Sequence, residues 1–186
     1  MTVTTLDRKS ALVLIDLQKG IAAMATAHPM ADIIARSAAL AEAFRKHGLP
    51  VVLVNVSGGA PGRTQEVRNM SGMPADWTDL VPELGAQPSD HRVTKKTWGA
   101  FTGTDLEDYL KHQGVTQIVL AGVATSIGVE STARYAYEYG FNIALATDAM
   151  TDRNPQARAN SVERIFPRLG ETGTADEIIA RLDHRS

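Results

Sequence analysis

The sequence contains no cysteine among its 186 residues. A chain without thiols cannot form disulfides, cannot bind a metal through thiolates and cannot use a cysteine as a catalytic nucleophile. Aromatic residues make up only 5% of the chain, whereas hydrophobic residues make up 44%. We therefore expect a core built mainly of aliphatic side chains.

Long runs of one residue type are also missing. The 19 basic and 21 acidic residues leave a net charge of -2 without a basic cluster, so nucleic acid is not an expected partner. No apolar run approaches the roughly 18 residues of a membrane helix, and the N-terminal segment lacks the pattern of an export signal. With no disulfide available either, we expect a cytoplasmic protein that does not enter membranes.

Short apolar runs alternate with helical patterns along the chain. Runs suited to buried parallel strands lie at residues 11–16, 51–56, 91–94, 117–123 and 141–147. Helical periodicity covers residues 32–47, 105–113, 128–140, 155–166 and 175–182. This alternation predicts an α/β fold with a single domain over residues 1–186. We expect a three-layer, Rossmann-like arrangement: an open, mostly parallel sheet of about six strands with helices on both faces.

Three strand ends carry the residues that could perform chemistry. Open parallel sheets bind ligands at the carboxyl ends of their strands, where Asp16, Lys95 and the segment 124–128 are expected to meet. Asp16 could be catalytic or could simply cap the following turn. Lys95 and its neighbour Lys96 occupy opposite strand faces, so either could be the functional lysine.

The segment from Gly122 to Arg134 predicts a strand, a tight turn and a helix. Amides of such a turn, including those of Ala124 and Gly128, could hold an anion or a developing oxyanion. The alternative is that the glycines only permit close packing of strand and helix. The Gly- and Pro-rich residues 57–90 form either a functional loop or a disordered one.

Three segments together resemble the isochorismatase-like hydrolase family. Residues 11–18 (ALVLIDLQ) resemble its first strand with a catalytic aspartate, and residues 95–101 (KKTWGAF) resemble its lysine segment. Residues 121–136 (AGVATSIGVESTARYA) resemble its nucleophile turn. The resemblance implies that Asp16 and Lys95 are catalytic, favours Lys95 over Lys96, and implies a cis peptide bond between Val123 and Ala124.

The chain departs from the amidases of that family at one position. Where those enzymes carry a cysteine, this sequence has Gly128, which offers no nucleophile. Ser126 and Ser131 do not replace it, because no His partner is indicated near either. No metal site with ligand spacing is visible and no cofactor is implied.

The expected function is that of an isochorismatase-like hydrolase without a covalent thiol intermediate. The resemblance implies a small anionic substrate, with a vinyl ether hydrolysed through acid–base catalysis by Asp16. Expected substrate contacts are Gln18, Trp98, Phe101 and Arg63, with Trp77 and Arg68 as further candidates. The alternative is a non-catalytic ligand-binding or scaffold protein that has lost the nucleophile. A homo-oligomer is expected, with Tyr135, Tyr137 and Tyr139 in packing or subunit contacts.

Overall fold

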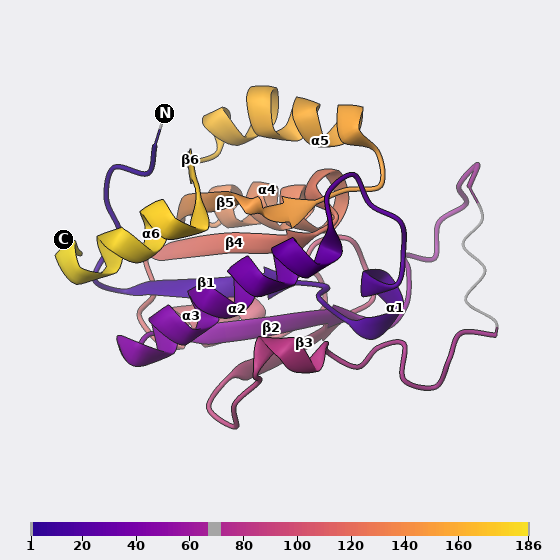
Figure 1. Cartoon of the computed structure of the whole chain (residues 1–186), viewed down its shortest axis with the longest axis horizontal. Helices are drawn as coiled ribbons and strands as arrows, with labels where there is room; N and C mark the ends of the chain where they lie inside the picture. Colours follow the sequence, from indigo (N-terminus) through magenta and orange to yellow (C-terminus); the bar gives the residue numbers. More distant parts are fainter. Residues whose placement is uncertain (1, 67–71, 186) are drawn as a thin grey trace.

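The computed structural model describes residues 2–66 and 72–185. Six strands form one sheet in the order β3-β2-β1-β4-β5-β6, and every neighbouring pair runs parallel. The strands are β1 (Ser10–Ile15), β2 (Val51–Val56), β3 (His91–Lys95), β4 (Gln117–Val123), β5 (Asn142–Thr151) and β6 (Glu171–Gly173). The predicted α/β fold with an open sheet of about six strands is confirmed (Figure 1).

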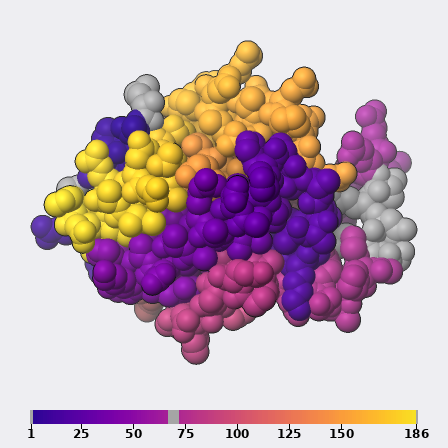
Figure 2. All heavy atoms as spheres, in the orientation of Figure 1, coloured from indigo at the N-terminus to yellow at the C-terminus, as the bar shows by residue number. Residues whose placement is uncertain are grey.

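Helices cover both faces of the sheet (Figure 1). They are α1 (Lys19–Ala22), α2 (Met30–Lys46), α3 (Leu106–His112), α4 (Glu130–Glu138), α5 (Pro155–Asn160) and α6 (Ala175–Arg181). Helices α2 and α6 pack against each other on the face that Figure 2 shows, whereas α3 and α4 lie on the opposite face. None of the described helices combines the length and apolar character needed to cross a membrane.

Alternate residues of the central strands pack into two apolar clusters, one on each face of the sheet. In β1, Leu12 and Leu14 join the cluster that contains the buried face of α2, while Val13 and Ile15 join the cluster with α3 and α4. Side chains of a strand point to opposite faces with a period of two, so a strand buried on both sides is apolar on both faces, as β1 and β4 are after their polar first residues, Ser10 and Gln117. All six residues of β1 and all seven of β4 are buried accordingly.

Element boundaries differ from the predicted ones mainly around the carboxyl edge of the sheet. The helix predicted over residues 128–140 begins as a π-helical turn, Thr125–Val129, before α4. The helix predicted over 155–166 is divided into α5, a second π-helical turn (Ser161–Ile165) and a 3-10 turn (Phe166–Arg168) whose Pro167 cannot donate to a continuing helix. The short elements α1 and β6 were not predicted because three or four residues carry no periodicity.

The segment that follows β2 begins at the carboxyl edge, on the same side as α1, and its later part runs back to the amino end of β3 (Figure 1). Its first part, residues 57–66, is almost wholly exposed. Its later part is anchored, because Leu80 forms a β-bridge with Gln18 and a 3-10 turn (Pro82–Leu84) buries Leu84. The described part of this long segment is therefore a loop with a fixed base beside the strand ends.

Candidate active site

A cavity of about 870 Å³ opens at the carboxyl edge of the sheet. It is lined by the end of β1, the segment after β3, the turn after β4 and the residues that follow β5. Asp16, Lys95 and Gly128 are all among its lining residues. The strand-end rule therefore brings together the three positions that the sequence had singled out.

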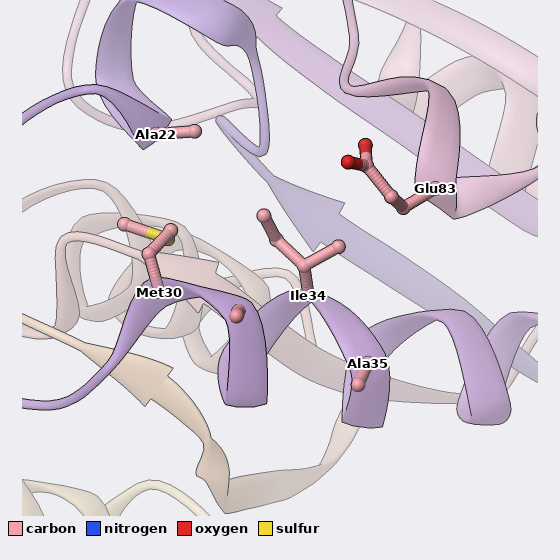
Figure 3. A pocket seen from close by; sticks show the side chains of 6 residues that line it. Ala22, Met30, Ile34, Ala35 and Glu83 are labelled. Carbon is pink, nitrogen blue, oxygen red and sulfur yellow. The ribbon is translucent and has the colours of Figure 1, made fainter.

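A second, smaller hollow of about 310 Å³ lies elsewhere, between α1, α2 and the turn that carries Glu83. Figure 3 shows the side chains of Met30 and Ile34 projecting from α2 into this hollow, with Met30 on the side of Ala22 and Ile34 between Ala22 and Glu83. Its lining is apolar apart from the single carboxylate of Glu83. Because it contains no group that could act together with Glu83, the larger cavity is the candidate active site.

Asp16 and Lys95 form a buried ion pair. The Lys95 Nζ donates to the Asp16 Oδ2 at 2.7 Å and to the Thr97 carbonyl at 3.2 Å. The two side chains are only 2% and 8% exposed. Strand β2 lies between β3 and β1, so the lysine stem reaches across the end of an intervening strand to meet the aspartate.

The backbone fixes which groups face the cavity. Asp16 has a φ of 53°, which a non-glycine residue rarely adopts but which aspartate tolerates better than most, and its N–H donates to the Val54 carbonyl. Lys95 is buried whereas Lys96 is exposed, as the alternation of side chains along a strand requires. The structure thus places Lys95, not Lys96, in the cavity with Asp16.

The turn after β4 brings residue 128 directly over Asp16. The peptide bond between Val123 and Ala124 is cis, as the resemblance implied, and Ala124 lines the cavity. A Cβ added to Gly128 would lie 3.3 Å from the Asp16 Oδ2 and 2.9 Å from the Ile15 Cγ2. A side chain at residue 128 would therefore point at the ion pair, and only glycine fits there without displacing Ile15.

A second polar group in the cavity, Ser126 with Asp152, was not predicted. The Asp152 Oδ2 accepts from both the backbone N–H and the Oγ of Ser126, each at 2.8 Å, and its Oδ1 accepts from the Asn154 N–H at 3.1 Å. Asp152 is 3% exposed. It follows β5, which runs four residues beyond its predicted end, so the sequence interpretation left Asp152 in a loop instead of at a strand end.

Two tryptophans stand at the cavity. Trp77 and Trp98 both line it, and Trp98 is 53% exposed. Trp77 is held next to α1, because the Gly20 N–H donates to its carbonyl and Lys19 pairs with Asp76 at 2.9 Å. The hydrogen bond to Asp76 raises the pKa of Lys19, and the same contact lowers the pKa of Asp76.

The other expected substrate contacts lie outside the cavity lining. The Gln18 side chain is buried and bonds the backbone of Val56 and Trp77, and Phe101 is 5% exposed and packs against Tyr139 and Phe141. Arg63 is exposed and does not line the cavity. Arg68 lies outside the described residues. Within residues 2–66 and 72–185, no group of three or more His, Asp or Glu side chains could hold a metal ion.

The chain was compared with protein families, known proteins and solved structures, and the matches point to one family. Residues 10–177 match the isochorismatase domain family. The chain belongs to the isochorismatase family. It is 41% identical over 182 residues to the isochorismatase family protein YwoC of Bacillus subtilis (strain 168), covering 94% of this chain and 95% of that protein.

A solved isochorismatase family structure from Burkholderia thailandensis has the same fold. It superimposes with a TM-score of 0.92 at 41% identity, covering 96% of this chain and 98% of that one. The ureidoacrylate amidohydrolase RutB of Variovorax paradoxus (strain S110) is 27% identical over 91% of this chain and 80% of its own. The match to the domain family confirms the family assignment made from the three sequence segments. Members of the isochorismatase family are hydrolases.

Proposed function

We propose that this isochorismatase-family protein is a hydrolase that acts on a small anionic substrate by proton transfer at Asp16, without a covalent nucleophile. The observation that carries the proposal is the buried Asp16–Lys95 pair at the wall of the cavity, where the neighbouring residue 128 has no side chain. A proton-transferring carboxylate needs access to the reacting atom, and Asp16 has it because it lines the cavity. The cavity of about 870 Å³ is large enough for a small organic acid.

The bond class that suits this site is a vinyl ether. Asp16 in its acid form would donate a proton to the terminal alkene carbon and leave an oxocarbenium ion at the ether carbon. Water then adds to that carbon, and the hemiketal releases an alcohol and a ketone. Asp16 recovers a proton from the added water, so the cycle closes with no bond between enzyme and substrate.

Lys95 prepares this chemistry through its charge. Its ammonium favours the ionised form of Asp16 in the free protein, whereas an acid catalyst must carry a proton. A substrate carboxylate that engages the Lys95 ammonium would neutralise it and permit Asp16 to hold a proton. The proposed substrate is therefore an enol ether that bears a carboxylate.

The decisive experiment offers the protein a panel of carboxylated vinyl ethers, including isochorismate, and measures release of pyruvate or the corresponding keto acid. We expect release by the wild type, and a loss of at least about 100-fold in kcat for Asp16→Asn and Lys95→Met, because general acid catalysis contributes about that much. Lys96→Met is the matched control, since Lys96 is the exposed neighbour, and it should keep wild-type activity.

Two results would contradict the proposal. Activity that survives in Asp16→Asn would exclude Asp16 as the proton donor. Binding of panel members without any turnover would favour the ligand-binding alternative, which the lost nucleophile side chain also supports. A thiol route can be tested with Gly128→Cys, for which we expect no gain of amidase activity, because the new Cβ would lie 2.9 Å from Ile15.

A further inference from the structure

We infer that Ser126 determines specificity by accepting a hydrogen bond from a hydroxyl or N–H group of the substrate, while Arg153 binds a carboxylate of the substrate other than the one that engages Lys95. This inference deepens the proposed function and rests on it, because it names the substrate class that the same cavity would take: a carboxylic acid that also carries a hydrogen-bond donor. Both residues line the cavity that contains Asp16 and Lys95.

The Ser126 hydroxyl is committed as a donor inside the protein. Its Oγ lies 2.8 Å from the Asp152 Oδ2, and an ionised carboxylate can only accept hydrogen bonds. The Ser126 N–H also donates to that oxygen at 2.8 Å, so the main chain holds the serine in place. A serine hydroxyl has one proton and two lone pairs, and what it offers the cavity is therefore its lone pairs.

Asp152 fixes the direction of the hydrogen bond that Ser126 donates. The residue is 3% exposed, and its second oxygen accepts from the Asn154 N–H at 3.1 Å. The Asn154 side chain accepts in turn from the backbone N–H groups of Gln156 and Ala157, at the start of α5. Because each acceptor is anchored by main-chain donors, the Ser126 proton cannot turn toward the cavity without leaving a buried carboxylate oxygen with one hydrogen bond fewer.

Arg153 supplies a cation without a protein partner. It is exposed, and it forms no ion pair with any residue that the structure describes. The other cation of the cavity, Lys95, is already paired with Asp16. A guanidinium presents a planar set of donors that matches a carboxylate, so the unpaired Arg153 is the group on this rim that suits an acidic ligand.

The test measures equilibrium binding, so it needs no turnover. The probes are benzoate, its 2-, 3- and 4-hydroxy derivatives, and the corresponding methoxy derivatives, titrated by calorimetry or tryptophan fluorescence. The ring substituent of the hydroxy compounds can donate a hydrogen bond, that of the methoxy compounds can only accept one, and benzoate has no ring substituent that does either. We expect at least one hydroxybenzoate to bind about 10-fold more tightly than benzoate, and no methoxybenzoate to show that gain.

The variants separate the two residues. Ser126→Ala should lower the affinity of the favoured hydroxybenzoate to that of benzoate and leave benzoate itself unchanged. Arg153→Gln should weaken all the carboxylates by about 10-fold and preserve the ratio between hydroxybenzoate and benzoate. Ser131→Ala is the matched control, because Ser131 lies on α4 outside the cavity lining and its loss should change neither quantity.

Asp152→Asn tests the direction of the hydrogen bond. With a neutral amide beside it, the Ser126 hydroxyl is free to donate, so the preference for hydroxy over methoxy ligands should shrink. If this variant does not fold, the Ser126→Ala series still decides the matter. The inference is overturned if no probe binds, if methoxy and hydroxy probes gain equally in the wild type, or if Ser126→Ala keeps the gain. Failure of vinyl ether hydrolysis with an intact hydroxyl preference would instead count against the proposed reaction alone.

Discussion

At residue 122, a side chain on β4 would collide with the backbone of β1. A Cβ on Gly122 would lie 2.1 Å from the Ile15 carbonyl oxygen, and its φ of 114° is one that L side chains rarely adopt. The pairing of β4 with β5 is irregular at this point, between Leu120 and Gly122. Gly122 therefore permits the close approach of strands that places the turn after β4 over Asp16.

Gly122→Ala should be strongly destabilising. The overlap with Ile15 involves backbone, which cannot move aside cheaply, and the positive φ adds its own penalty, so we expect a loss of about 3 kcal/mol or more in the free energy of unfolding. Urea denaturation followed by circular dichroism measures it. Gly48→Ala is the control, because Gly48 also has a positive φ of 65° but a Cβ there would meet nothing within 4 Å.

For Gly48→Ala the expected cost is about 1 kcal/mol, which is the penalty for the conformation alone. Equal losses in the two variants would show that the contact with Ile15 carries no weight. If Gly122→Ala yields no folded protein while Gly48→Ala does, Gly122→Ala is shown to be the more destabilising of the two substitutions.

Side-chain direction is what the sequence could not supply at this scale. Asp16 and Lys95 were predicted because each lies at a strand end within a segment that resembles the isochorismatase-like family, and the structure joins them in one ion pair. Gln18 and Phe101 are close to those residues in the sequence, yet their side chains turn into the interior instead of the cavity. Ser126 has no signal of its own, because its role depends on Asp152, which the fold brings from another strand.

Among the elements, α6 shows a helix start that the sequence does encode. Thr174 caps it: the Thr174 Oγ1 accepts from the Glu177 N–H at 3.2 Å, while the Glu177 side chain accepts from the Thr174 N–H at 2.8 Å. This reciprocal pair needs only residues three positions apart. Local chemistry of that kind is readable from sequence, whereas the π-helical turn Thr125–Val129 has no side-chain cap hydrogen bond at its start and was not predicted.

Thr174→Ala should lower the free energy of unfolding by about 1 kcal/mol, because the N–H of Glu177 loses its acceptor at the helix start. Chemical denaturation reports this value directly. Thr102→Ala is the matched control, since Thr102 is exposed and lies outside the helices and strands, and it should change stability by less than about 0.5 kcal/mol. A Thr174→Ala protein as stable as the control variant would show that the capping box contributes nothing.

At the scale of the whole molecule, the parallel sheet assembles the site from distant parts of the chain. Asp16 and Lys95 are 79 residues apart, and Ser126 and Asp152 are 26 residues apart. The strand order places β1 and β4 at the centre, so residues that follow them meet in the cavity. The fold class and this edge could be predicted from alternating apolar runs, but the exact partners required the register of the strands.

The C-terminal turn is fastened to the body of the protein by a histidine. The His47 Nε2 lies 2.9 Å from the Asp183 Oδ1, and its Nδ1 lies 2.7 Å from the Ala43 carbonyl. Both ring nitrogens thus face acceptors, which suits the protonated imidazolium. The hydrogen bond to Asp183 chiefly raises the pKa of His47 above its ordinary value of 6.5, and the same contact lowers the pKa of Asp183 below 3.8.

This contact should make part of the stability depend on pH. Because the pKa of His47 is raised on folding, its contribution is fully present below about pH 6.5 and is lost as the pH rises through the folded value. Asp183 stays ionised throughout that range because its pKa is lowered. His47→Gln should therefore lower the Tm relative to wild type at pH 5.5, and the difference should disappear near pH 9. In an Asp183→Asn background most of the pH-dependent difference should be absent, whereas a constant difference from pH 5.5 to 9 would exclude His47 as its source.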